Sequence, residues 1–161
     1  MFELYNNKNK ITKDKYDVIY RFIISNYFDR CKDKLAEKDQ IDTKEAYNNW
    51  VNTILTTNDY NILLYIENKK IIGFVSFMYT DNYLCLSEVQ FDPKYTNKGY
   101  LKTMLKGVIN YSDRAKYNMI YGTINKNNEL SKNVFKHIGF INTEKNRYEI
   151  SYNNLIKWLN S

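Results

Sequence analysis

The sequence predicts an α/β (α+β) fold in which helices flank a mixed, mostly antiparallel central sheet. Three observations support this fold class. Apolar residues recur at helical spacing before residue 57, three β-rich runs separated by short polar turns follow, and a strand, a helix and a further strand come next. Short turns join antiparallel neighbours, whereas the strand, helix and strand indicate one parallel crossover.

The first third of the chain is predicted to hold one short strand and two helices. The strand covers residues 2–6, and Thr12 is the expected N-cap of a helix over residues 13–35. A second helix is expected to open at Thr43, with Trp50 on its inner face. Both helices show the apolar spacing of elements that pack on one side against a core.

The middle of the chain is rich in strands. The runs Ile62–Glu67, Ile71–Tyr79 and Tyr83–Phe91 are separated by the polar turns "ENKK" and "TDN", which predicts an antiparallel meander. Pro93 ends the third run because proline cannot donate a hydrogen bond to a strand ladder.

The helical period returns after Gly99 and is followed by the strand "NMIYGTIN". The next helix is expected to be capped by Asn127 or Asn128 and to end in a left-handed turn at Gly139. The segment "FINTEKNRYEISY" then predicts a closing hairpin, and "NNLIKWLNS" a terminal amphipathic helix.

Composition indicates one globular domain over residues 1–161, since 43% of residues are hydrophobic and 26% are charged. No apolar leader or membrane-length window is present, so we predict a soluble cytoplasmic protein without a membrane partner. Cys31 and Cys85 lack the paired spacing of a metal or redox motif and are expected to be free buried thiols. With a single histidine as well, no metal site is predicted.

The formal net charge of +6 suits a nucleic-acid binder, a membrane-surface protein or a binder of a small polyanion. Because the basic residues are spread along the whole chain and no nucleic-acid reading motif is evident, no nucleic-acid partner is expected.

A more specific signal lies in "DPKYTNKGYLKTMLKG", residues 92–107, where a strand ends and a helix opens at a glycine. The unpaired backbone N–H groups at such a helix start bind anions. Lys98 and Lys102 carry positive charge to the same end of the helix, which the helix dipole disfavours unless an anion is bound. Two interpretations stay open for these lysines: they bind a multiply charged anion, or they extend into water.

Two segments have a related pattern: "VQFDPKYTNKGYLKTMLKGVI" and, about thirty residues on, "TINKNNELSKNVFKHIGF". Together they resemble the best-known motifs of the GNAT family of N-acetyltransferases. The matching residues are Pro93, Tyr95, Gly99 and Leu105 in the first motif, and Asn128, Phe135, Gly139 and Phe140 in the second.

The resemblance implies the acyl-CoA N-acyltransferase fold and transfer of an acetyl group from acetyl-CoA to a primary amine of a small molecule or peptide. Transfer would occur by direct attack in a ternary complex, in a monomer or a homodimer. The implied coenzyme-binding residues are Val89, Gln90 and Phe91 for the pantetheine arm, Thr96, Asn97, Lys98, Gly99, Tyr100, Leu101 and Lys102 for the pyrophosphate, Asn128 for the pantetheine chain, and Phe135 near the thioester.

The chain departs from the family pattern at several of these positions. Thr96 replaces an Arg or Gln, Asn97 a frequent Gly, and Leu101 a Gly or Ala. Leu101 either crowds the phosphates and weakens coenzyme binding, or points into the core. Phe135 stands where the family often uses a Tyr to protonate the departing thiolate.

Glu88 is the predicted general base. Some members carry a Glu on the strand before the second motif, but Thr123 holds that place here. A carboxylate in a central strand is costly unless paired or solvated, so Glu88 is interpreted as a base or amine anchor facing a cleft. The alternative is a glutamate that faces water or pairs with a lysine. A non-catalytic acyl-CoA-binding module is the alternative function.

Overall fold

The computed structural model describes residues 1–28, 43–57 and 59–161. Within these residues one seven-stranded sheet has the order β1-β2-β3-β4-β5-β7-β6, and only the β4–β5 pair is parallel. The predicted fold class is confirmed. The strands are β1 (Phe2–Tyr5), β2 (Asn61–Glu67), β3 (Lys70–Thr80), β4 (Tyr83–Phe91), β5 (Met119–Thr123), β6 (Ile141–Glu144) and β7 (Arg147–Ser151).

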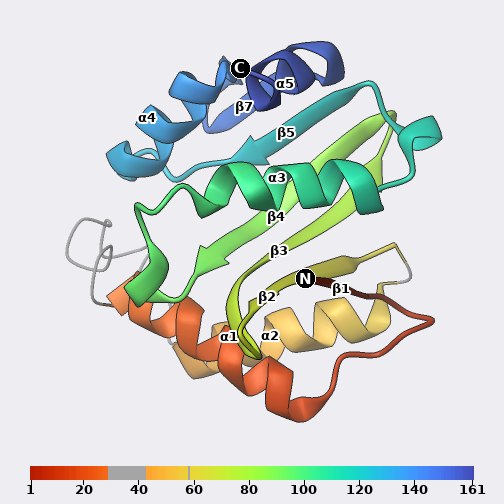
Figure 1. Cartoon of the computed structure of the whole chain (residues 1–161), viewed down its shortest axis with the longest axis vertical. Helices are drawn as coiled ribbons and strands as arrows, with labels where there is room; N and C mark the ends of the chain where they lie inside the picture. Colours follow the sequence, from red (N-terminus) through yellow and green to blue (C-terminus); the bar gives the residue numbers. More distant parts are fainter. Residues whose placement is uncertain (29–42, 58) are drawn as a thin grey trace.

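The helices pack on both faces of the sheet and are drawn in Figure 1. They are α1 (Lys13–Asn26), α2 (Thr43–Thr56), α3 (Tyr100–Tyr111), α4 (Glu129–Ile138) and α5 (Tyr152–Leu159), with short 3₁₀ turns η4 (Pro93–Tyr95) and η5 (Arg114–Lys116). α1 and α2 cover one face of the sheet, where they pack on β1, β2 and β3, whereas α3, α4 and α5 cover the other face. The part of the first predicted helix beyond residue 28 lies outside the described residues.

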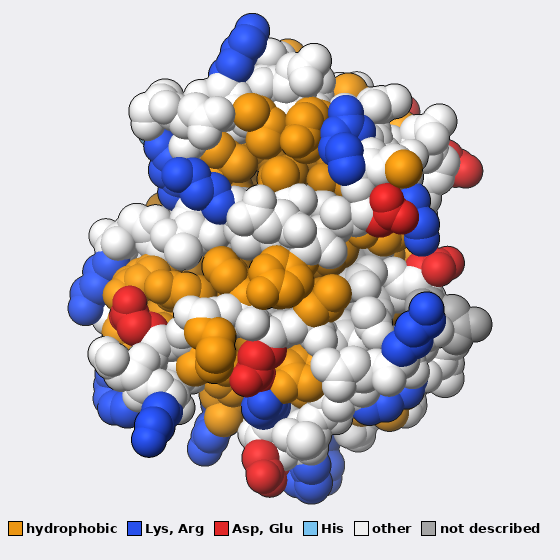
Figure 2. Space-filling model, turned by 45° about the vertical axis from the view of Figure 1, so that its right-hand side comes forward, with side chains coloured by type: hydrophobic (Ala, Val, Ile, Leu, Met, Phe, Trp, Pro, Cys, Tyr) orange, Lys and Arg blue, Asp and Glu red, His pale blue; other side chains and the backbone are white. Residues whose placement is uncertain are grey.

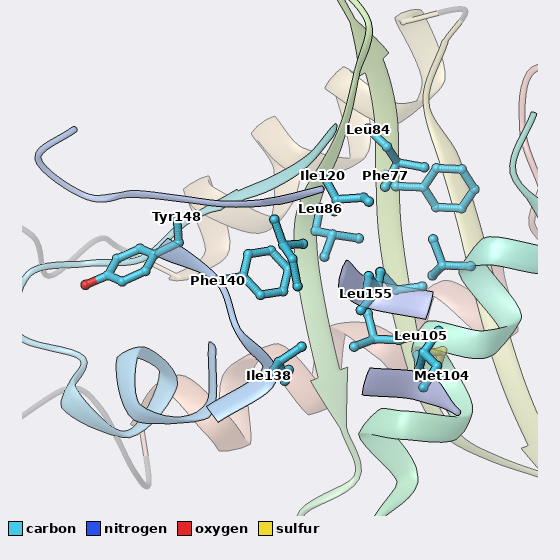
Figure 3. Close-up of a cluster of buried hydrophobic side chains, with 14 of the residues drawn as sticks. Phe77, Leu84, Leu86, Met104, Leu105, Ile120, Ile138, Phe140, Tyr148 and Leu155 are labelled. Carbon is cyan, nitrogen blue, oxygen red and sulfur yellow. The ribbon is translucent and has the colours of Figure 1, made fainter. Parts of the chain in front are cut away.

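The larger core lies between the sheet and α3, α4 and α5. Met104 and Leu105 of α3 are buried against Phe77, Leu84 and Leu86 of the central strands, as Figure 3 shows. Each such side chain contributes about 1.5–3 kcal/mol when it is fully removed from water. This packing fixes where α3 begins relative to the end of β4.

A β-bulge changes the direction of the side chains in the second half of β4. Ser76 pairs with Glu88, but Phe77 pairs with Leu86, so Ser87 is the extra residue. Leu84 and Leu86 face the α3 side before the bulge, and Val89 and Phe91 face it afterwards. Glu88 and Gln90 are thereby directed to the α1 side. The irregular apolar spacing 84, 86, 89, 91 is the sequence signal of this bulge.

Most of the predicted helix ends are confirmed. The side chain of Asn128 caps α4 by accepting a 3.1 Å hydrogen bond from the Ser131 N–H, and Gly139 ends α4 at φ 109°. Thr12 stands at the start of α1, but its side chain makes no capping bond. The expectation of a buried Cys85 was wrong: the thiol is free but partly exposed, because Cys85 points away from the main core. Cys31 lies outside the described residues.

Candidate functional site

The central feature of the site is the divergence of β4 from β5. Their parallel pairing runs from Tyr83 with Met119 to Leu86 with Gly122 and stops there. β4 continues to Phe91 paired only with β3, and no described strand covers its other side beyond Leu86. Figure 1 shows the two strands separating toward the side where α3 and α4 begin. The backbone groups of β4 that point into this gap can pair with an extended ligand.

The loop between β4 and α3 ends in an exposed helix start. Asn97 and Gly99 have left-handed backbones, with φ of 61° and 79°. Gly99 is the N-cap of α3 and supplies no side-chain bond to its first N–H groups. Asn97, Lys98 and Gly99 are all exposed, and the first two residues of the helix, Tyr100 and Leu101, are partly exposed. Such a set of uncapped donors is an anion site.

Aromatic contacts fix this loop on the sheet. The Tyr100 hydroxyl donates a 2.9 Å hydrogen bond to Glu67 at the end of β2, and the Tyr100 ring lies 5.8 Å from that of Tyr65. Tyr95 packs edge-on against Tyr100, with 5.9 Å between ring centroids. The helix start is therefore held in place by β2 before any ligand binds.

The two predicted lysines differ in their contacts. Lys98 Nζ lies 5.3 Å from the Tyr95 ring centroid, next to the helix start. Lys102 Nζ instead donates a 2.7 Å hydrogen bond to the Ser161 main-chain oxygen and lies 5.3 Å from the Trp158 ring. Leu101 packs against the main core, which is the second of the two alternatives for this residue. It does not point into the loop.

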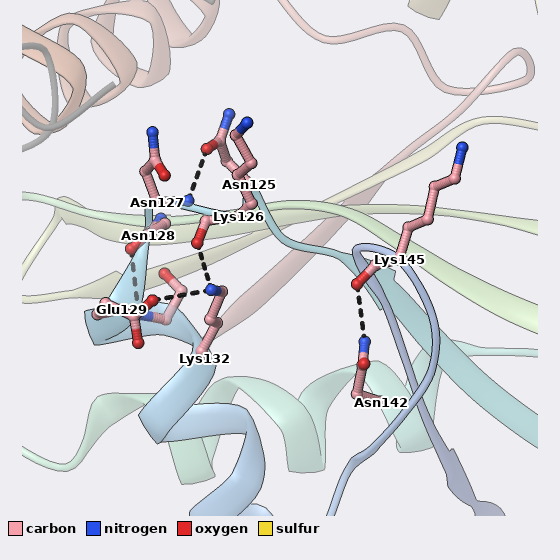
Figure 4. Close-up of polar contacts among 9 residues, drawn as sticks. Asn125, Lys126, Asn127, Asn128, Glu129, Lys132, Asn142 and Lys145 are labelled. Atoms are coloured by element: carbon pink, nitrogen blue, oxygen red, sulfur yellow. Dashed lines mark hydrogen bonds and ion pairs between the residues drawn. The ribbon is translucent and has the colours of Figure 1, made fainter. Parts of the chain in front are cut away.

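The start of α4 presents a second group of polar atoms at the gap. Figure 4 shows Asn125 and Asn128 ordering the turn: Asn125 Oδ1 accepts from the Asn127 N–H at 2.9 Å, and Asn128 Oδ1 is used in the cap. Lys132 reaches back to the Lys126 carbonyl. The Asn128 side-chain NH₂ donates to none of the described residues, which leaves a donor free for a ligand amide.

Phe135 forms an apolar wall beneath β5. Its ring lies 4.5 Å from that of Phe140 and 6.5 Å from that of Tyr148. A Cβ added at Gly122 would lie 3.1 Å from the Phe135 ring, so the glycine lets this ring approach the end of β5. No proton donor stands at this position.

Glu88 lies at the start of a polar chain that joins β4 to α1. Gln90 donates a 3.1 Å hydrogen bond to Glu88 Oε2. Asn26, the last residue of α1, donates to Gln90 Oε1 at 2.8 Å and to the Phe91 carbonyl at 2.9 Å. The end of α1 is thus fastened to the segment of β4 that diverges from β5.

The surroundings of Glu88 disfavour its charged form. Although part of the side chain reaches the surface, desolvation by the protein raises the pKa of Glu88, and the hydrogen bond from Gln90 opposes this only in part. Directly opposite on β3, the Ser76 hydroxyl is fully buried and has no partner among the described residues. A carboxyl group with a raised pKa is suited to accept a proton near neutral pH.

The basic residues form no single field on the face drawn in Figure 2, where Lys and Arg side chains are scattered. Within the described ranges, no cluster of three or more His, Cys, Asp or Glu side chains could hold a metal ion. None of the described helices combines the length and the apolar character that crossing a membrane requires.

Sequence reasoning missed Arg147 and Glu149, which lie on β7 near the gap. Arg147 Nε donates a 2.7 Å hydrogen bond to Glu149 Oε1, and its guanidinium stacks on Tyr121 of β5. The alternation in "RYEIS", with two charges on one face of a half-buried strand, was the available signal.

Comparison with known proteins gives a consistent result. The acetyltransferase (GNAT) domain model matches residues 10–141. A search of curated proteins by sequence gave no match.

Solved structures share the fold. The PaiA N-acetyltransferase of Thermoplasma acidophilum, in complex with coenzyme A, is 15% identical, with a TM-score of 0.68 over 94% of this chain and 99% of that one. An acetyltransferase of Thermus thermophilus is 12% identical, with a TM-score of 0.71 over 94% and 97%. The spermidine N-acetyltransferase of Vibrio cholerae, with CoA and spermine, is 14% identical, with a TM-score of 0.64 over 96% and 98%.

The predicted family and its fold are confirmed. The roles of the individual site residues, the single-domain organisation, the cytoplasmic location and the monomeric or homodimeric state stay predictions.

Proposed function

Because the chain belongs to the GNAT acetyltransferase family, whose domain model matches residues 10–141, we propose that it transfers the acetyl group of acetyl-CoA to a primary amine. The amine attacks the thioester directly in a ternary complex. The observation that carries this proposal is the divergence of β4 from β5 beside the uncapped start of α3. When the thioester of acetyl-CoA lies in that gap, the rest of the coenzyme lies on one face of the sheet and an acceptor can approach from the other.

The coenzyme is held mainly by backbone groups. The pantetheine arm pairs with the free side of β4 along Val89, Gln90 and Phe91. The pyrophosphate accepts hydrogen bonds from the N–H groups that follow Gly99, with Lys98 as an added charge. Lys102, which is bonded to Ser161, contributes only if that bond is exchanged for one to phosphate.

Other contacts complete the coenzyme site. The free Asn128 amide donates to the pantetheine chain, and Phe135 supplies an apolar wall near the thioester.

Glu88 removes the proton from the acceptor ammonium group. An alkylamine with a pKa near 10.4 is mostly protonated at neutral pH and must lose a proton before it can attack. The amine nitrogen then bonds to the thioester carbonyl carbon, and backbone N–H groups of β4 near Val89 stabilise the oxyanion. The C–S bond breaks, the thiolate leaves with its electron pair, and the second proton on the former amine nitrogen passes to that thiolate or to water. A thiol pKa of about 8.5 makes it an adequate leaving group even though Phe135 offers no proton.

An amine acceptor is supported by one of the solved relatives. The Vibrio cholerae structure is named a spermidine N-acetyltransferase and contains spermine. At 14% identity this likeness concerns the fold, so it supports the class of acceptor rather than that particular molecule.

The cofactor is tested by the effect of acetyl-CoA on thermal unfolding. A ligand at 100 times its dissociation constant stabilises the folded protein by about 2.7 kcal/mol. We therefore expect a clear rise in melting temperature with millimolar acetyl-CoA. An unchanged melting temperature would contradict the assignment of acetyl-CoA as the co-substrate.

A non-catalytic acyl-CoA-binding module is the second candidate, favoured by the apolar surroundings of Phe135 and by Thr123. Both candidates predict stabilisation by acetyl-CoA. They differ in whether free thiol appears when acetyl-CoA is mixed with a panel of amines. Thiol release that depends on the amine identifies the enzyme, and its absence with every amine identifies the binding module.

Replacing Gly99 by alanine tests the helix start. A Cβ at this position meets nothing within 4 Å, but φ is 79°, so the cost is backbone strain of about 1–2 kcal/mol and not a clash. We expect Gly99→Ala to lower stability by that amount and also to weaken acetyl-CoA binding, as measured by calorimetry.

Gly139→Ala is the matched control, because Gly139 also has a left-handed backbone but lies at the far end of α4. It should lower stability and leave acetyl-CoA affinity unchanged. Equal acetyl-CoA affinities for the two variants would show that the start of α3 does not bind the coenzyme.

A further inference from the structure

The face of the sheet over β5 and β7 carries an unusual cluster outside the coenzyme site. The apolar cluster under α1 and α2 draws its strand residues from β1, β2 and β3, and contains none from β5 or β7. On this face the described helices leave Tyr83, Tyr121, Arg147 and Glu149 partly exposed. We call these four residues the arginine shelf.

The shelf holds the Arg147 guanidinium in one orientation. Its central carbon lies 3.8 Å from the Tyr121 ring centroid and 4.8 Å from that of Tyr83. The two rings meet edge to face at 5.7 Å. Glu149, whose side chain is 14% exposed, accepts the Arg147 Nε–H at 2.7 Å. Rotamer freedom of the arginine is thus already restricted before a ligand arrives.

The two terminal nitrogens of Arg147 remain available. Within the described ranges neither makes a hydrogen bond or an ion pair, and the side chain is 31% exposed. Arg114 shows the contrast. It stacks 3.9 Å from the Tyr152 ring, but one terminal nitrogen donates to the Tyr117 carbonyl and to Asn118. Arg114 stabilises a turn through its terminal nitrogen, whereas the two terminal nitrogens of Arg147 are held in place and make no hydrogen bond to the described residues.

The shelf adjoins the point where β4 and β5 part. Tyr121 pairs with Cys85, one step before the last pair, Leu86 with Gly122. Glu88 lies three residues beyond Cys85 and faces the same side of the sheet, the side of Gln90 and α1. Arg147 lies on β7 and Glu88 on β4, with β5 between them, so a ligand that reaches both groups must span more than one strand spacing of about 4.8 Å.

We infer that Arg147 binds a carboxylate of the acceptor, so that the substrate is a small molecule that carries an amine at one end and a carboxylate at the other. This inference rests on the proposed acetyl transfer. A guanidinium fork binds a carboxylate through two parallel hydrogen bonds, which fixes direction as well as position. With its carboxylate on Arg147, an ω-amino acid presents its amine to Glu88. The acceptor class is therefore ω-amino carboxylates rather than simple amines or polyamines.

The test compares two acceptors that differ only in the carboxylate, 6-aminohexanoate and hexylamine. Thiol release from acetyl-CoA is measured over a range of each acceptor. We expect kcat/KM for 6-aminohexanoate to be higher by about tenfold or more, the usual effect of hydrogen bonds to a charged group. Arg147→Met should abolish this preference, because activity with 6-aminohexanoate falls while activity with hexylamine does not. Arg147→Lys, which keeps the positive charge, should retain part of the preference.

Lys145→Met is the matched control. It removes one positive charge from the exposed turn of the same hairpin without touching the shelf, so the preference should persist. Equal kcat/KM for the two acceptors in the natural protein, or a preference that survives Arg147→Met, would overturn the inference while leaving acetyl transfer intact.

A binding measurement separates failure of this inference from failure of the proposed function. Hexanoate carries the carboxylate but no amine, and its binding is followed by NMR titration without coenzyme. The natural protein and Lys145→Met should bind it, and Arg147→Met should not. If acetyl-CoA fails to bind while this pattern holds, the carboxylate site stands and the acetyltransferase proposal falls. Equal hexanoate binding by all three proteins contradicts the site.

Discussion

Glu88→Gln is expected to lower the rate of thiol release at neutral pH by roughly 10²–10⁴-fold, the usual contribution of a positioned general base. Glutamine keeps the shape of the side chain and can still accept the hydrogen bond from Gln90, so the local structure is retained. The loss should appear in kcat with little change in acetyl-CoA affinity. Steady-state kinetics with a single amine, together with calorimetry, measures both quantities.

The pH profile identifies the role of Glu88 more directly. The pKa of Glu88 is raised by desolvation, so the base becomes protonated, and the rate falls, at a pH above that for an ordinary carboxyl group. In Glu88→Gln the break at this pKa should be absent, and the rate should instead fall steadily with pH as the fraction of unprotonated amine falls. Toward pH 10 the amine, with a pKa near 10.4, loses its own proton and the two rates should converge. Parallel profiles over the whole range would exclude Glu88 as the base.

The same substitution should stabilise the fold at neutral pH. A folded-state pKa above the unfolded value of about 4.3 means that folding favours the protonated carboxyl. That favourable contribution is complete below the unfolded pKa and is lost as pH rises through the raised folded pKa. At neutral pH the ionised Glu88 therefore costs stability, which uncharged glutamine avoids.

Denaturation at two pH values checks this sign. Glu88→Gln should be more stable than the natural protein at pH 7, and the difference should vanish below about pH 4. Glu144→Gln, which alters an exposed side chain of β6, is the control and should give no such gain. A variant that is slower and yet more stable is typical of a group kept for function at a cost in stability.

The fold was predictable because most of its signals are local. The polar turns between the strands, the asparagine cap of α4 and the glycine at its end each depend on neighbouring residues. The crossover followed from the helical period that returns after Gly99 and the strand that comes after it, which requires no knowledge of distant contacts.

The features that could not be predicted join residues far apart in the chain. Lys102 was expected at the pyrophosphate, but it bonds Ser161, which is 59 positions away. The fastening of Asn26 to Gln90 spans 64 positions, and no periodicity reports such a pair. Arg147 of β7 contacts Tyr121 of β5 and Tyr83 of β4 only because these three strands are neighbours in the sheet, in the order β4-β5-β7. Contacts of this kind follow from the assembled sheet order.

Gly73→Ala is expected to be the most damaging small change near the coenzyme strand. A Cβ at residue 73 would lie 2.5 Å from the Phe91 ring and 2.7 Å from the backbone oxygen of Gln90. A ring can rotate, but the oxygen belongs to the diverging segment of β4, which must then move. Overpacking of this kind costs about 1–3 kcal/mol, measurable by chemical denaturation. Because β4 provides the proposed pantetheine edge, acetyl-CoA affinity should fall as well.

Gly107→Ala separates the two effects of Gly73→Ala. A Cβ at residue 107 would lie 2.5 Å from the ring of Phe2, and its three nearest atoms all belong to that ring, so α3 and β1 are overpacked while β4 is untouched. Because the Phe2 ring can rotate and alanine favours a helix, the control should lose less stability, and it should bind acetyl-CoA as the natural protein does. If Gly73→Ala loses stability but keeps full affinity, the coenzyme does not pair with this edge of β4. If β4 shifts and binding stays intact, the pantetheine arm is held mainly at the start of α4.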